Sequence, residues 1–96
     1  MAVESTAGAE LALRRKRLRY RAWHRGTKEM DILLGSFADA NLDRLDADML
    51  DRFEALIGEA DTDLTLWLMG RQPVPAHVDA ELIADILADH EQRIGS

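Results

Sequence analysis

Apolar residues recur along the chain at intervals of three and four, the spacing of one face of an α-helix. The clearest stripe follows Thr27 and has the i, i+3, i+4, i+7, i+8 pattern of a core-facing helix. It consists of Met30, Leu33, Leu34, Phe37 and Ala38. No alternation of apolar and polar residues persists as it would in a strand. The pattern predicts an all-α protein, a small bundle of five helices in a single domain.

The first two predicted helices meet at a glycine. A helix over about residues 10–23 carries only a narrow apolar stripe, and the rest of its surface is basic. Gly26 is expected to end this helix, because glycine readily adopts the left-handed conformation that is common just after a helix. Thr27 is expected to cap the second helix through its hydroxyl.

Three further helices follow a polar connection. Asp46 is expected to cap the third, over about residues 47–59. Asp61 or Thr62 is expected to cap a short fourth helix, and a linker with both prolines leads to a fifth over about residues 79–90. Their predicted core positions are Met49, Leu50, Phe53, Leu56, Ile57, Leu64, Trp67, Leu68, Leu82, Ile83, Ile86 and Leu87.

The 96 residues suit one domain, which we expect over residues 10–90. Residues 1–9 are expected to be a disordered tail and residues 91–96 a frayed one. The first residues carry acids and no base, unlike a targeting signal. No apolar run approaches the ~20 residues of a membrane span. The absence of cysteine suits a reducing compartment. We therefore expect a bacterial cytoplasmic protein without membrane insertion.

The net charge of −6 hides an asymmetry. Eight of the twelve bases lie between Arg14 and Lys28, whereas sixteen of the eighteen acids lie from Glu29 onward. A basic helix with interleaved aromatic residues attracts phosphates. The acidic body opposes approach to a polyanion, and the second helix lacks the polar face of a DNA reader. A nucleic-acid-binding or antitoxin-like module that uses the basic first helix stays open as the alternative function.

Catalytic and metal motifs are not recognisable. His24, His77 and His90 lie far apart in a chain without cysteine, so no metal site is expected. No GxSxG motif or Ser/His/Asp frame is present, and we expect no enzyme. Tyr20 and Trp23 permit transient flavin contact, but no dinucleotide-binding fold is predicted, so no stably bound cofactor is expected.

The stretch HRGTKEMD, residues 24–31, places charged residues at the predicted bend. The simplest interpretation is a helix stop followed by a helix start, with solvated charges. The spacing also permits a docking corner. There, Gly26 would allow close approach of a partner, and Arg25 and Glu29 would lie together as a donor and an acceptor.

These residues resemble the signature of the SdhE-type FAD assembly factors. The family's Arg-Gly-x-x-Glu motif, the basic run before it and the acid after it match Arg25, Gly26, Glu29, Arg17, Leu18, Tyr20, Arg21 and Asp31. A second family segment resembles the stretch with Asp61, Leu64, Trp67, Gly70 and Pro73. The resemblance covers about residues 14–90.

The resemblance implies a five-helix assembly factor that promotes covalent attachment of FAD to the flavoprotein subunit of succinate dehydrogenase or fumarate reductase. Such a factor acts on the FAD of its client and holds none stably. The implied client-binding residues are Arg25, Gly26, Glu29, Asp31, Arg17, Tyr20 and Arg21. Arg25 would pair with an acceptor of the client, and Glu29 would brace Arg25 or accept from a client arginine. We expect a monomer.

Overall fold

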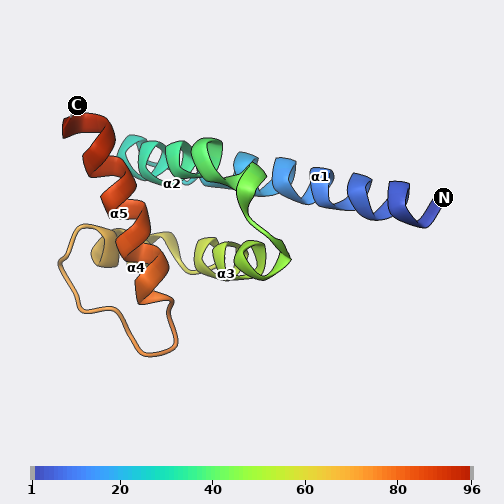
Figure 1. Cartoon of the computed structure of the whole chain (residues 1–96). Helices are drawn as coiled ribbons and strands as arrows, with labels where there is room; N and C mark the ends of the chain where they lie inside the picture. Colours follow the sequence, from blue (N-terminus) through green and yellow to red (C-terminus); the bar gives the residue numbers. More distant parts are fainter. Residues whose placement is uncertain (1, 96) are drawn as a thin grey trace.

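The computed structural model describes residues 2–95 (Figure 1). The elements in chain order are α1 (Ala2–Trp23), α2 (Lys28–Asn41), the 3₁₀ turn η1 (Leu42–Arg44), α3 (Ala47–Ile57), α4 (Asp61–Leu68) and α5 (Ala80–Gly95). Over these residues the structure contains five α-helices and no strand. The predicted all-α fold is confirmed.

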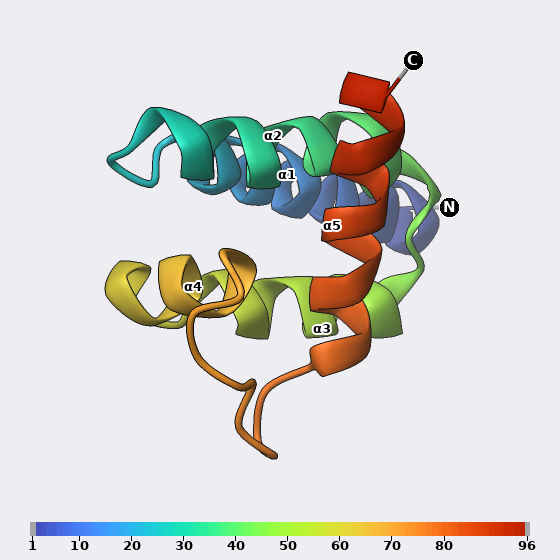
Figure 2. The same cartoon turned by 90° about the vertical axis from the view of Figure 1, so that its left-hand side faces the viewer.

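The helices form two layers that α5 crosses. α1 and α2 pack against each other as an antiparallel pair, and α3 and α4 lie beneath them (Figures 1 and 2). α5 runs along one side of both layers, and an extended stretch after α4 loops away from the body before α5 begins (Figure 2). The turn between α1 and α2 lies above the start of α4, at the same end of the molecule (Figure 2).

Two helix starts agree with the predicted caps. The Thr27 hydroxyl accepts a hydrogen bond from the Met30 amide at 3.3 Å, at the start of α2. The Asp46 carboxylate accepts from the Met49 amide at 2.9 Å, at the start of α3. Each cap satisfies an amide that has no partner within its helix.

The predicted cap of α4 is wrong. The N-cap is Ala60, which makes no side-chain cap bond, and Asp61 is the first residue inside the helix. The Asp61 carboxylate is instead hydrogen-bonded to the Arg25 side chain. The Asp61 carboxylate, which the local sequence assigns to capping, therefore forms a tertiary ion pair with Arg25 instead.

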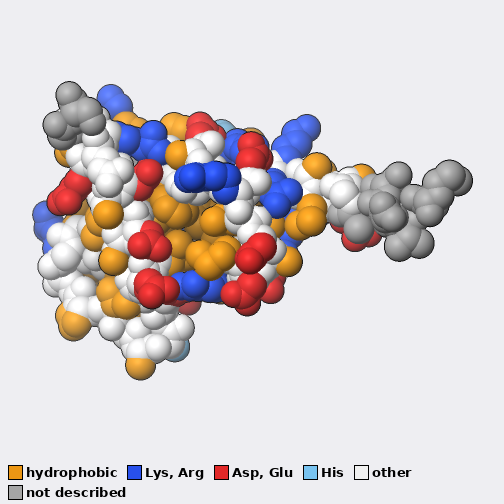
Figure 3. Space-filling view, viewed as in Figure 1, with side chains coloured by type: hydrophobic (Ala, Val, Ile, Leu, Met, Phe, Trp, Pro, Cys, Tyr) orange, Lys and Arg blue, Asp and Glu red, His pale blue; other side chains and the backbone are white. Residues whose placement is uncertain are grey.

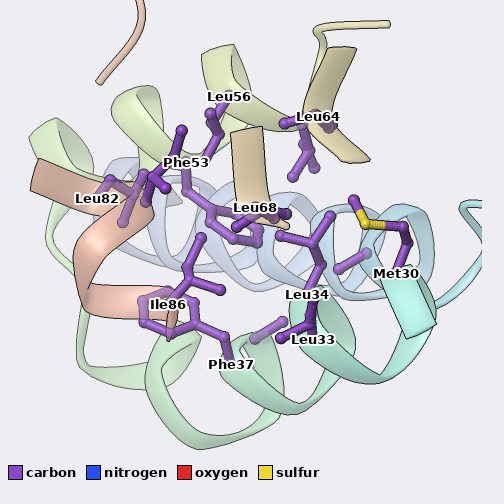
Figure 4. Close-up of a cluster of buried hydrophobic side chains, with 14 of the residues drawn as sticks. Met30, Leu33, Leu34, Phe37, Phe53, Leu56, Leu64, Leu68, Leu82 and Ile86 are labelled. Carbon is purple, nitrogen blue, oxygen red and sulfur yellow. The ribbon is translucent and has the colours of Figure 1, made fainter. Parts of the chain in front are cut away.

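The core lies between the two layers and α5 (Figure 4). It contains every predicted position of α2 and the predicted leucine, isoleucine, phenylalanine and tryptophan positions of α3 and α4. Met49 and Leu87 are only partly buried. Leu42 and Val78 are buried although both lie in stretches that read as connections, and Leu42 is 0% exposed.

Both ends are helical further than expected. α1 begins at Ala2, within the segment expected to be a tail. α5 continues to Gly95, and Arg93 donates to the Asp89 carboxylate at 2.9 Å and to the Ser36 carbonyl at 3.0 Å. Met1 and Ser96 lie outside the described residues, and disorder of the two ends in solution stays a prediction. Over the described residues, no helix has both the length and the apolar character to span a bilayer.

Candidate functional site: the corner between α1 and α2

The turn between α1 and α2 is an exposed corner built around a glycine. Gly26 has a φ of +110°, a region that residues with a Cβ rarely adopt. Residues 26–29 are exposed, and a Cβ built on Gly26 meets no atom within 4 Å. Gly26 is therefore required by the backbone conformation, and the space beside it is open to a partner.

Arg25 points back into the molecule. Its Nη2 donates to the Asp61 carboxylate at 2.5 Å and lies 3.4 Å from the Glu59 carbonyl oxygen. The side chain is only 11% exposed. The expectation that Arg25 and Glu29 offer a matched donor and acceptor is therefore corrected, because the start of α4 lies close beneath the corner and its Asp61 supplies a carboxylate to Arg25.

Asp31 also stabilises the corner through a hydrogen bond inside the molecule. Its carboxylate accepts a hydrogen bond from the Arg25 backbone amide at 2.6 Å. The bond joins the first turn of α2 to the turn that follows α1. Arg25 and Asp31 thus fix the corner to the rest of the fold.

Glu29 is the acidic group that the corner presents to solvent. It lies exposed in the first turn of α2, where a carboxylate is favoured by the helix dipole. Among the described residues its carboxylate has no ion pair or hydrogen bond. Glu29 does not brace Arg25, which is bonded to Asp61.

The outer face of α1 carries the other three predicted client-binding residues. Tyr20 is 65% exposed, and its ring stacks on His24 with 3.9 Å between the ring centroids. A shallow depression of about 410 Å³ is lined by Leu13, Lys16, Arg17, Tyr20 and Arg21. The structure therefore brings Arg17, Tyr20 and Arg21 together on one exposed surface.

Other bases of α1 are used inside the molecule. Arg14 donates to Asp51 at 2.6 Å and to Glu54 at 2.8 Å, and these hydrogen bonds raise its pKa, with that to Asp51 the larger cause. Arg15 donates to the carbonyls of Leu42 and Leu45, both at 2.9 Å. Figure 3 shows basic side chains next to acidic ones on one face. Part of the charge asymmetry is therefore neutralised within the fold, which leaves fewer bases for a polyanion.

Comparison with known proteins identifies the family. The family described as Sdh5, flavinator of succinate dehydrogenase, matches residues 16–90. The chain belongs to this family. Its members are assembly factors and not catalysts, and this chain therefore promotes flavinylation of the succinate dehydrogenase flavoprotein. The predicted family and function are confirmed, and the nucleic-acid alternative is set aside.

Relatives occur in bacteria and in mitochondria. The chain is 42% identical over 85 residues to the FAD assembly factor SdhE of Acetobacter pasteurianus, covering 88% of this chain and 78% of the relative. It is 33% identical over 75 residues to the mitochondrial succinate dehydrogenase assembly factor 2 of Dictyostelium discoideum, covering 78% and 53%. It is 35% identical over 82 residues to the mitochondrial succinate dehydrogenase assembly factor 2 of Aedes aegypti, covering 83% of this chain and 50% of the relative. The chain thus spans about half the length of these mitochondrial relatives. No solved structure matches the chain.

The role of Asp61 was missed at the sequence level. Arg25 belongs to the first segment that resembles the family and Asp61 to the second, and the two are in direct contact. A signal was present, since both segments carry the resemblance. Their contact could not be inferred, because nothing local reports which side chains meet across 36 residues.

Proposed function

We propose that residues 26–29 are the surface on which the chain docks to the flavoprotein subunit of succinate dehydrogenase. The observation that carries the proposal is the open corner at Gly26, followed by the unpaired Glu29 carboxylate. Arg25 and Asp31 act indirectly by holding the corner in place. Glu29 accepts from a basic group of the client.

The chain supplies geometry, and the client supplies the covalent chemistry. The flavin carries the reactivity, and protein groups around it contribute orientation and electrostatics. Docking at the corner holds the FAD-loaded client in the conformation in which its own histidine bonds to the flavin. The chain contributes no nucleophile and holds no FAD stably.

The exposed face of α1 is the second contact. Arg17 and Arg21 flank Tyr20, and such a basic and aromatic surface suits an acidic rim of the client. Charge complementarity of this kind mainly raises the rate of association. We infer that the chain acts as a monomer in a bacterial cytoplasm, and that the fumarate reductase flavoprotein is a further client.

The test is a set of substitutions at the corner with covalent client flavin measured by in-gel fluorescence. Gly26→Arg blocks the surface with a long side chain, and Glu29→Ala removes the carboxylate. Each should lower covalent flavin at least about tenfold, the effect of losing a central interface contact. Circular dichroism checks that the variants remain folded.

Gly26→Ala is the matched control. Alanine and arginine at position 26 both strain the backbone at its positive φ, which costs about 1–3 kcal/mol of folding free energy. Only arginine also adds a long side chain to the surface. Flavinylation should therefore fall much less in Gly26→Ala. Wild-type covalent flavin in folded Gly26→Arg and Glu29→Ala would show that the corner is not the docking surface.

A further inference from the structure

An apolar groove begins where the corner ends. It has a volume of about 270 Å³ and lies between α2, the end of α4 and α5. The buried side chains of Leu33 and Leu68 line it, together with Ile32 and Met69, which are 37% and 41% exposed. Glu29 lines the same groove. The groove is therefore continuous with the exposed part of the corner.

The size of the groove limits what can occupy it. A cavity of about 150 Å³ holds a benzene molecule, and sites for cofactors and drug-sized ligands are mostly about 300–1,000 Å³. A groove of about 270 Å³ that is open to solvent accommodates one large or two small apolar side chains. A flavin dinucleotide is too large and too polar for it.

Two polar groups border the apolar lining. Glu29 lines one part of the groove, and its carboxylate has no partner among the described residues. His90 also lines it, and the Nδ1 atom of its ring is buried without a hydrogen-bond partner in the described structure. Buried polar atoms are usually paired, so an unpaired one calls for an explanation. A docked segment with a basic group would pair with the exposed Glu29 carboxylate, whereas the buried Nδ1 atom of His90 lies out of its reach.

We propose that this groove receives an apolar side chain of the client flavoprotein, from a segment that also carries a basic residue. The basic residue pairs with Glu29, and the apolar side chain lies between Ile32 and Met69. The inference rests on the proposed docking at the corner and extends it to a further contact of defined chemistry. Charge complementarity selects the basic residue, since an unpaired carboxylate beside an apolar surface disfavours an acidic segment.

Thiol protection tests contact with the groove directly. The chain contains no cysteine, so Met69→Cys creates a single reactive site in the groove. Ala40→Cys is the matched control, because Ala40 is exposed on α2 about two turns beyond Ile32. Addition of the flavoprotein subunit with bound, unattached FAD should slow maleimide modification at position 69 at least about tenfold, and at position 40 less than about twofold.

The alternative occupants give different results. Slow modification of free Met69→Cys that depends on chain concentration would show that a second copy covers the groove, and would overturn the proposal. Equal modification rates at position 69 with and without the client would overturn it as well. Binding of the flavoprotein subunit to the control variant Ala40→Cys is measured in parallel. It shows whether the complex formed under the conditions of the modification experiment.

Charge insertion separates the groove from the corner. Met69→Glu and Ile32→Glu place a carboxylate at exposed positions of the groove, where folding tolerates it, and should weaken client binding at least about tenfold. Ala40→Glu should bind as wild type. If Gly26→Arg abolishes binding while both groove variants bind normally, the corner is correct and the groove is wrong. If all three bind normally, both proposals fail.

Discussion

Arg25 shows how a surface motif can act from inside the molecule. The guanidinium is largely covered, its Nε is buried without a partner, and Asp61 supplies the neutralising charge. The Arg25 amide is held separately by Asp31. Arg25, the first residue of the motif, thus holds its neighbours in position, and we propose that the exposed groups on either side of Thr27 make the contact with the client.

Exchanging the charges of Arg25 and Asp61 tests this role. Arg25→Asp or Asp61→Arg alone should lower the free energy of unfolding by about 1–2 kcal/mol, because each leaves like charges facing each other in a partly exposed site. The double variant should recover stability and covalent client flavin together. Denaturant unfolding and in-gel flavin fluorescence are the two measurements.

The two measurements separate positioning from contact. If the double variant regains stability while flavinylation stays as low as in Arg25→Asp, Arg25 touches the client directly. Recovery of both quantities supports the positioning role. Asp48→Arg, at an exposed acid in the first turn of α3, controls for the change in net charge.

At the scale of elements, α1 and α2 approach closely at one glycine. A Cβ built on Gly35 would lie 2.2 Å from the Trp23 ring carbon Cδ2, so the ring occupies the space of a side chain. The Trp23 indole Nε1 donates to the Asp39 carboxylate at 3.2 Å, which fixes the ring across α2. This contact anchors the end of α1 immediately before the corner.

Gly35→Ala should therefore destabilise the protein by about 1–3 kcal/mol through overpacking, against the gain of about 1 kcal/mol that alanine brings to a helix. Urea unfolding measures the change. The loss should shrink in the double variant with Trp23→Leu, because the smaller side chain leaves room for the methyl group.

A second helical glycine provides the control. Gly8 meets nothing within 4 Å, so Gly8→Ala should leave stability unchanged or raise it. If Gly35→Ala is as stable as wild type, the Trp23 ring moves away at little cost and does not anchor the corner.

At the scale of the whole molecule, one ionic cluster links the start of α5 to α3 in the lower layer of helices. Arg52 on α3 donates to Asp79 at 2.5 and 3.0 Å and to Glu81 at 3.0 Å. Asp79 also accepts from the Leu82 amide at 3.0 Å at the start of α5. The cluster joins α3 to the start of α5. It therefore limits the motion of the long stretch that connects α4 to α5.

Stability should depend on pH through Asp79. The hydrogen bond from Arg52, and to a smaller extent that from the Leu82 amide, lowers the pKa of Asp79. Since the folded state binds the proton less tightly, this contribution is present above the unfolded pKa of about 4 and is lost as pH falls through the folded pKa. Asp79→Asn should lower Tm by a few degrees at pH 7, and the difference from wild type should narrow at acidic pH.

Thermal unfolding of both proteins between neutral and acidic pH measures this dependence. Asp85→Asn, at an exposed acid of the same helix, should show no such convergence. A difference between Asp79→Asn and wild type that stays constant from pH 7 to the acid range would exclude the ionised pair as its cause.

The amino-acid sequence by itself determined the helices, most of the core and the family. The reason is that helix periodicity and the caps at Thr27 and Asp46 act over a few residues, and a contiguous motif is visible without coordinates. The position of the corner between α1 and α2 was predictable on the same grounds.

Only the tertiary structure decided what each charge does. Arg25 and Asp61 are 36 residues apart, and whether the Arg25 side chain faces a partner or the molecule depends on where the start of α4 lies. Leu42 is buried in a stretch of polar character because helix packing covers it. Side-chain partners follow from the arrangement of elements, and that arrangement is set by the burial of all the apolar faces together.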